Sequence, residues 1–255
     1  MGTLHGDMRA WNDLLSVHEH RPYPLPDTPF SITMSWHDLL FAHWPVDTAA
    51  LRELIPADLE LDLWENRAWL GLVPFVMRQV GPPPLNQLPW ISAFPELNVR
   101  TYVKHRGKLG VWFFSLDAAN WGAVVAARVG FHLPYFWARI QCEPAASGVR
   151  YRSRRLAGPS AEFRARYAPT GDVFHAAQSS FEHWLTERYC LYSADRRGRV
   201  YRGDIHHVPW PLQTAEAEFE INHMTEWTGL PLPGDPPVLH FARRLDVVAW
   251  SLAVA

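Results

Sequence analysis

Polar and apolar side chains alternate along residues 96–103, and the polar ones are types that could do chemistry. Because successive side chains of a β-strand point to opposite faces, one face would carry a carboxylate, an amide, a guanidinium and a phenol, from Glu96, Asn98, Arg100 and Tyr102. A carboxylate can act as a general acid or base, and a guanidinium can bind a carboxylate or an enolate. The row therefore predicts a site for a small, partly apolar molecule with a carbonyl or carboxylate group.

A β-hairpin and a short helix are the elements expected to position this row. Residues 104–110 have the polar, glycine-containing composition of a turn, and residues 111–116 are rich in aromatics, so Phe114 of the returning strand would add an apolar wall. Pro134 stands where a proline opens a helix, which predicts a helix from Tyr135 to Ile140. The start of that helix beside Tyr135 would favour an anion or a developing oxyanion.

Lysine is nearly absent from the chain. Of the 24 basic residues, only Lys104 and Lys108 are lysines, and both lie in the predicted hairpin turn. An amine in such a turn stays solvated and protonated, which makes it a poor nucleophile at neutral pH. The sequence therefore argues against catalysis through a lysine Schiff base.

One stretch of about forty residues resembles the acetoacetate decarboxylase family without a gap. Glu96 matches an active-site glutamate of that family, Arg128 matches the arginine of its Gly-Arg-Glu segment, and residues 133–136 match its aromatic-Pro-Lys-Lys motif. In the family the first lysine forms the Schiff base with a β-keto acid and the second lowers its pKa. Here the two positions are Tyr135 and Phe136, and neither side chain can form an imine.

A closer resemblance is to the uncharacterised YqjF-like branch of the same superfamily. It is carried by FAHWPVD, ELNVRTYV, LPY, LTERYCLYS and HHVPWPLQ, and it spans about Trp36 to Trp250. The resemblance implies a single domain that curls into a barrel or cone. Thirteen tryptophans and 22 prolines also favour strands and rigid loops over long helices.

We therefore predict a mainly antiparallel β-fold with a few short helices (α+β) that resembles the acetoacetate decarboxylase-like fold. Residues 35–255 would form this one domain. Residues 1–34 would form a proline-rich N-terminal arm that lies on the body or on a neighbouring subunit.

Two hypotheses of function follow. The first is a lyase or hydrolase that works by acid–base chemistry, and the residues assigned to catalysis are Glu96, Arg100 and Tyr135. In it Glu96 is the general acid or base, Arg100 or Arg128 binds a carboxylate or enolate, and Tyr135 donates a hydrogen bond to the reacting carbonyl. The second is a non-catalytic protein that kept the ligand pocket. In either case the residues assigned to substrate binding are His43, Asn98, Tyr102, Phe114 and Arg128.

Two alternatives remain open from the residues alone. His43 is the one ionisable group on an otherwise apolar strand face, so it is either a hydrogen-bonded core histidine or a pocket residue. Glu96 and Arg100 lie four residues apart on one strand face, so they could also have only a structural role and satisfy each other or nearby backbone groups.

Other functional classes find little support. A net charge of −2 gives no electrostatic reason to bind nucleic acid or an anionic membrane. Cys142 and Cys190 have no zinc-site spacing, and the chain lacks the GxGxxG, P-loop, HExxH and GxSxG motifs. We expect a cytoplasmic protein without cofactor or metal, whose partner is a small-molecule ligand or substrate and whose arm is compatible with a homo-oligomer.

Overall fold

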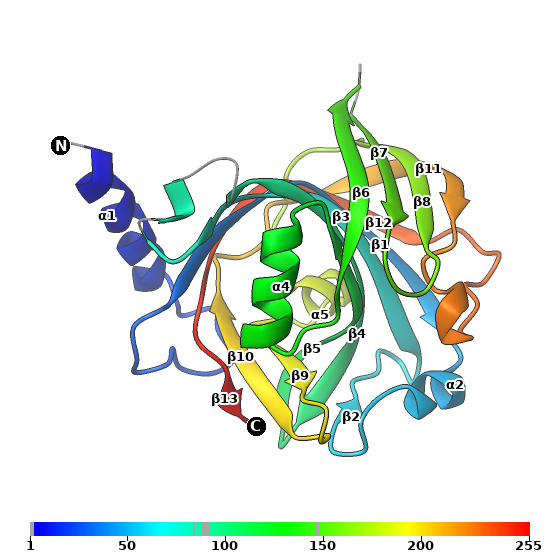
Figure 1. Cartoon of the computed structure of the whole chain (residues 1–255), viewed down its shortest axis with the longest axis horizontal. Coiled ribbons are helices and arrows are strands. Elements are labelled where there is room, and N and C mark those ends of the chain that lie inside the picture. Colours follow the sequence, from blue (N-terminus) through cyan, green and yellow to red (C-terminus); the bar gives the residue numbers. More distant parts are fainter. Residues whose placement is uncertain (1–2, 84, 88–91, 146–147) are drawn as a thin grey trace.

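Strands dominate the computed structural model, which describes residues 3–83, 85–87, 92–145 and 148–255 (Figure 1). The α-helices in the described residues include α1 (Thr3–Ser16), α2 (Thr48–Glu53), α4 (Trp121–Gly130) and α5 (Phe181–Thr186). The first strands are β1 (Ile32–Val46), β2 (Glu60–Leu61), β3 (Ala68–Gly81), β4 (Phe94–His105), β5 (Lys108–Ala118), β6 (Tyr135–Pro144) and β7 (Val149–Arg155). The others are β8 (Glu162–Pro169), β9 (Cys190–Ala194), β10 (Val200–His206), β11 (Leu212–Asn222), β12 (Val238–Ala249) and β13 (Ala253–Val254).

These strands form one mixed sheet that pairs back on itself. Its order is β13-β10-β9-β5-β6-β7-β8-β11-β12-β1-β3-β4-β2, and the further pairings β4–β5 and β10–β12 fold it over. Strand β5 runs parallel to β6 and to β9, and the other pairs are antiparallel. The predicted fold class, mainly antiparallel β with a few short helices, is confirmed.

Strand β4 is buried on both faces. Leu97, Val99 and Val103 belong to one apolar cluster, together with residues of β7 and β8. On the other face Glu96 is paired with Phe75, and Asn98 with Val73, and both apolar partners belong to a second cluster. Directly paired residues share a face of the sheet. The polar row therefore lies inside the fold, with Glu96 and Asn98 on the side of the second cluster and Tyr102 in a third cluster.

The predicted hairpin is confirmed as β4 and β5, but a β-bulge changes which aromatic side chain faces the polar row. Val99 is paired with Ser115, whereas Arg100 is paired with Phe113, so Phe114 is an extra residue in β5. An extra residue reverses the alternation of faces beyond it. Phe114 consequently packs in the first cluster, and Phe113 packs against the second.

The predicted helix from Tyr135 to Ile140 is wrong. These residues begin β6, and the neighbouring helix is α4, which lies earlier in the chain and crosses the front of the sheet in Figure 1. Leu116 pairs in parallel with Tyr135, and its amide donates to the carbonyl of Pro134 at 3.0 Å. Aromatic side chains favour such a pleated, partly buried strand. As neighbours on a strand, Tyr135 and Phe136 therefore point to opposite faces.

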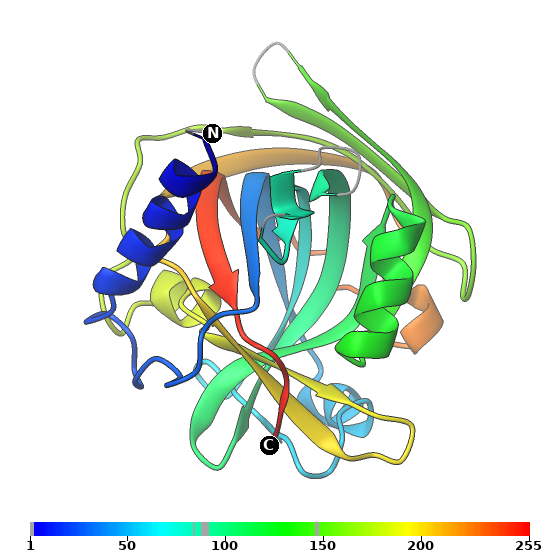
Figure 2. The ribbon, with the colours of Figure 1, turned by 60° about the vertical axis from the view of Figure 1, so that its left-hand side comes forward.

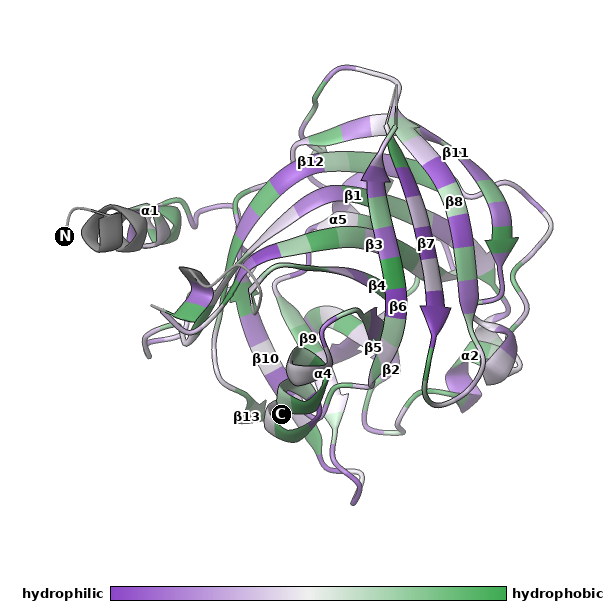
Figure 3. Cartoon of the chain, turned by 45° about the horizontal axis from the view of Figure 1, so that its top comes forward, coloured by the Kyte–Doolittle hydropathy of each residue, from purple (hydrophilic) through white to green (hydrophobic). Residues whose placement is uncertain are grey.

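The N-terminal segment lies against the body. Figure 2 shows α1 beside β12, and buried Trp11 packs with Val248 and Trp250. The division of the chain into an arm of residues 1–34 and a domain of residues 35–255 stays a prediction. Figure 3 shows hydrophilic and hydrophobic residues alternating along β7, β8 and β11, as expected of strands with one face outward. Among the described residues, no helix has the length and apolar character needed to cross a membrane.

Candidate functional site

Glu96 lies near the start of β4 and is only 2% exposed. The hydroxyl of Tyr135 donates to its Oε2 at 2.8 Å, and the side chain of Asn98 also hydrogen-bonds to it. Burial raises the pKa of the Glu96 carboxyl to about 8, although these two hydrogen bonds oppose the rise. Glu96 is therefore mostly protonated at neutral pH and close to the point where it titrates.

Arg100 is a buried guanidinium, 8% exposed, whose Cζ lies 5.2 Å from the ring centroid of Phe41. In the described part of the chain no carboxylate forms an ion pair with it, and its Nε has no hydrogen-bond partner. Two other buried arginines differ in this respect, since Arg155 and Arg188 each lie 2.6 Å from a carboxylate, of Asp117 and Asp62 respectively. The alternative that Glu96 and Arg100 satisfy each other is therefore wrong, and among the described residues Arg100 has no carboxylate counter-ion.

His43 reaches the same place from β1. Its Nε2 lies 2.6 Å from the Tyr102 hydroxyl, and both residues are fully buried. Burial, reinforced by the charge of Arg100, lowers the pKa of His43 well below its ordinary value, so the imidazole is neutral. Gly71 of β3 makes room for this arrangement, because a Cβ there would lie 2.9 Å from Nε2 of His43.

The polar row thus has two ends. Glu96, Asn98 and Tyr135 meet at one end, whereas Arg100, Tyr102 and His43 meet at the other. Residues four apart on a strand have Cα atoms about 13 Å apart, so Glu96 and Arg100 belong to separate clusters on the same strand face. Asn98 stands between them, and its buried Oδ1 has no partner among the described residues.

Two predicted site residues lie elsewhere. Phe114 faces the first apolar cluster because of the bulge in β5. Arg128 is exposed on α4, and its Cζ lies 5.4 Å from the ring centroid of Phe136. Phe136 is on the face of β6 opposite to Tyr135, so neither Arg128 nor Phe114 is brought to the polar row.

Sequence reasoning missed several residues around Tyr102. The ring of Trp184, on α5, lies 4.6 Å from the Tyr102 ring, and the Cζ of Arg188 lies 4.8 Å from it. His240 of β12 is buried and pairs with Phe41 of β1. These contacts join segments far apart in the chain, and no local pattern marks residues 184 and 188 as neighbours of β4 or residue 240 as a neighbour of β1.

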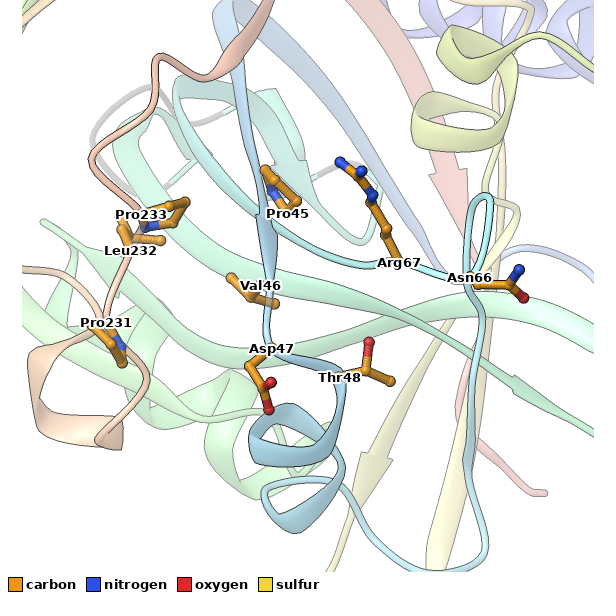
Figure 4. Close-up of a pocket in the computed structure, with 9 residues that line it drawn as sticks. All are labelled: Pro45, Val46, Asp47, Thr48, Asn66, Arg67, Pro231, Leu232 and Pro233. Atoms are coloured by element: carbon orange, nitrogen blue, oxygen red, sulfur yellow. The ribbon is translucent and has the colours of Figure 1, made fainter.

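The site is distinct from a surface pocket of about 460 Å³ at the end of β1. Nine residues line that pocket, none of which belongs to the polar row, and Figure 4 shows them around the junction of β1 and α2: Pro45, Val46, Asp47, Thr48, Asn66, Arg67, Pro231, Leu232 and Pro233. Within the described ranges, no group of three His, Cys, Asp or Glu side chains could hold a metal ion.

Comparison with known proteins gives the family. The model of the DUF2071 family, described as an uncharacterized conserved protein, matches residues 33–246. The chain belongs to the DUF2071 family. It is 45% identical to the uncharacterized protein YqjF of Bacillus subtilis (strain 168). The match extends over 228 residues, which is 89% of this chain and 94% of YqjF. The predicted resemblance to the YqjF-like branch is confirmed.

Solved structures with the same fold come from the acetoacetate decarboxylase-like superfamily. The enduracididine biosynthesis enzyme MppR, complexed with pyruvate, has a TM-score of 0.62 and 13% identity, covering 89% of this chain and 91% of MppR. The acetoacetate decarboxylase of Legionella pneumophila also has a TM-score of 0.62 and 13% identity, covering 93% of each chain. At such identities the likeness establishes the fold, and this DUF2071 protein adopts the fold predicted for it.

Proposed function

We propose that this DUF2071 protein binds a small carboxylic acid with a carbonyl group on the face of β4 that carries Glu96 and Arg100. The protein would act on this acid as a lyase or hydrolase without a Schiff base. One observation carries the proposal. In the part of the chain that the structure describes, Arg100 is buried without a carboxylate counter-ion, on the same strand face as Glu96, whose carboxyl pKa is raised to about 8. An uncompensated buried charge is unfavourable, and an anionic ligand would relieve it.

Arg100 would bind the carboxylate of the ligand. Charge-assisted hydrogen bonds to a guanidinium are worth about 1.5–3 kcal/mol each, and they fix the orientation of a carboxylate. Phe41 and Phe113 lie on the same side and would take up apolar parts of the ligand. The carbonyl group would then point along the strand towards Glu96.

Glu96 would exchange a proton with the bound molecule. A carboxyl group with a pKa of about 8 is a suitable general acid at neutral pH and becomes a general base above it. Tyr135, which donates to Glu96 at 2.8 Å, could instead donate to a carbonyl oxygen and stabilise developing negative charge. Both groups are hydrogen-bonded in place, so neither step needs a lysine.

The relatives support the class of ligand. MppR was solved with pyruvate, a small keto acid, and the Legionella protein is an acetoacetate decarboxylase. The second candidate function is binding without catalysis. The replacement of both motif lysines by Tyr135 and Phe136 favours it, because a pocket can outlast the loss of its catalytic amine.

Thermal-shift measurements with pyruvate, phenylpyruvate and their methyl esters test the proposal. A ligand at a hundred times its Kd stabilises a protein by about 2.7 kcal/mol, so the free acids should raise the Tm of the wild type and the esters should do so less. Arg100→Ala should abolish the effect. Arg152→Ala, at an exposed arginine of β7, is the matched control and should retain it.

The outcomes separate the candidates. Equal stabilisation of Arg100→Ala and the wild type would contradict the proposal. If the wild type turns over an acid that it binds, and Glu96→Gln binds the acid without turnover, the enzyme is supported. Binding of the acids without turnover in the wild type supports the binding protein.

A further inference from the structure

A buried hydrogen bond joins Tyr102 to His43. The Tyr102 hydroxyl lies 2.6 Å from Nε2 of His43, and the guanidinium of Arg100 lies nearby, with its Cζ 5.9 Å from the centroid of the Tyr102 ring. Among the described residues the hydrogen-bond partner of this hydroxyl is Nε2, so the buried phenol proton is satisfied only if Tyr102 donates it to Nε2. The positive charge of Arg100 favours the same direction, because it attracts the oxygen end of the hydroxyl.

This direction determines the tautomer of His43. A neutral imidazole carries one proton, and Nε2 acts as an acceptor, so the proton is on Nδ1. Burial and the neighbouring charge of Arg100 favour the neutral form, and burial keeps the Tyr102 hydroxyl protonated. His43 therefore presents an N–H group at Nδ1.

That N–H group and the Nε–H group of Arg100 are both buried and both lack a partner among the described residues. The two side chains meet over Gly71, since a Cβ at Gly71 would lie 2.9 Å from Nε2 of His43 and 3.4 Å from Cγ of Arg100. Two unpaired donors beside one uncompensated positive charge fit an anion with two acceptor oxygens. They do not fit a cation or an apolar group.

We infer that His43 is a binding residue, and that its Nδ1–H group and the Nε–H group of Arg100 hold the two oxygens of one ligand carboxylate. The inference rests on the proposed function and deepens it, because it restricts the ligands to monocarboxylates that leave their other end free for Glu96. Tyr102 has a positioning role, since it keeps the His43 proton on Nδ1. Gly71 leaves the space in which the imidazole can take this orientation.

The tautomer can be measured without any ligand. Nitrogen-15 NMR of the histidine side chains distinguishes a protonated from an unprotonated ring nitrogen, and the His43 signals are assigned by their loss in His43→Asn. We expect protonated Nδ1 and unprotonated Nε2 in the free wild type at neutral pH, and a mixture of tautomers in Tyr102→Phe. Protonated Nε2 or a charged ring in the wild type would overturn the inference.

Isosteric variants test the contact with the ligand, with phenylpyruvate as the probe in calorimetric titration. The side-chain amide nitrogen of Asn can replace Nδ1 of histidine, whereas that of Gln replaces Nε2. His43→Asn should bind within a few-fold of the wild type, and His43→Gln should bind about tenfold more weakly or worse. His223→Gln, at an exposed histidine, is the control and should bind like the wild type.

Failure of the inference and failure of the proposed function give different results. If the wild type binds phenylpyruvate and both His43 variants bind it equally well, His43 makes no contact and the inference alone is overturned. If no acid binds the wild type, the proposed function fails together with the inference, although the Nδ1–H tautomer would still be seen. If a His43 variant fails to fold, Tyr102→Phe decides, because weaker binding together with mixed tautomers supports the inference and unchanged binding overturns it.

Discussion

Glu96 is the residue whose environment most changes its chemistry, and the change should be visible in stability. Its ordinary pKa is 4.5 and its pKa in the fold is about 8, so between these values the folded protein holds a proton that the unfolded chain has released. Stability should therefore fall as pH rises through this window, by about 1.4 kcal/mol per pH unit. Glu96→Gln should remove this fall, which urea unfolding at pH 5, 7 and 9 will measure.

Glu218→Gln is the control for this prediction, since Glu218 is exposed on β11. Its unfolding free energy should follow that of the wild type across the three pH values. A wild type and a Glu96→Gln variant with the same pH dependence would mean that Glu96 is ionised in the folded state. Its assignment as a general acid at neutral pH would then be untenable.

The ion pair of Asp117 and Arg155 makes the second prediction at this scale. Both side chains are fully buried, and Nη2 of Arg155 lies 2.6 Å from Oδ1 of Asp117. Asp117 is paired with Leu97, so it lies on the face of the sheet opposite to Glu96. Asp117→Asn leaves the guanidinium without its counter-ion, which should cost about 3–5 kcal/mol of unfolding free energy. The double variant Asp117→Leu with Arg155→Met should recover much of that loss in urea unfolding. A single variant as stable as the wild type would refute this.

At the scale of elements, β4 and its hairpin could be predicted because alternation and turn composition are local signals. The face of Phe114 could not, because a one-residue bulge leaves no clear mark in the sequence. Pro134 was misleading for a related reason. Proline can precede either a helix or a strand, and the pairing of Tyr135 with Leu116 of β5 decided between them.

Gly71 of β3 supports the third prediction. In Gly71→Ala the new Cβ would lie 2.9 Å from the His43 ring, closer than ordinary contact allows, so the ring must move. We expect a loss of about 1–3 kcal/mol of stability and weaker binding of phenylpyruvate.

Gly130→Ala is the matched control for Gly71→Ala. Its Cβ, at the end of α4, meets nothing within 4 Å, so its stability in thermal unfolding should stay within about 1 kcal/mol of the wild type. Equal effects of the two substitutions would contradict the packing seen at His43.

At the scale of the whole molecule, the fold class followed from composition, strand patterns and family resemblance. The resemblance also implied that the sheet curls, but the strands that fold it over could not be identified, because β10 meets β12 through a short pairing of Ile205 with Ala249 and His206 with Val248. The end of the site that contains Arg100, Tyr102 and His43 depends on similar long-range contacts. Trp184 and His240 reach it only once α5 and β12 have docked, so local sequence signals could supply one half of the site and not the other.

The N-terminal arm gives the last prediction. Trp11 is buried against Val248 and Trp250, and His206 donates from Nε2 to the carbonyl of Leu14 at 3.0 Å. An arm held in this way is part of the fold, so Trp11→Ala should cost about 3–5 kcal/mol in urea unfolding. Val17→Ala, at a side chain that is 51% exposed, should cost no more than about 0.5 kcal/mol.

The concentration dependence of this effect separates the two positions expected for the arm. If the arm lies on its own body, as in the structure, the unfolding midpoints of the wild type and of Trp11→Ala should not change with protein concentration. If it lies on a neighbouring subunit, unfolding also separates the subunits, and the wild-type midpoint should rise with concentration. Equal stabilities of Trp11→Ala and Val17→Ala would instead mean that the arm contributes nothing to the folded protein.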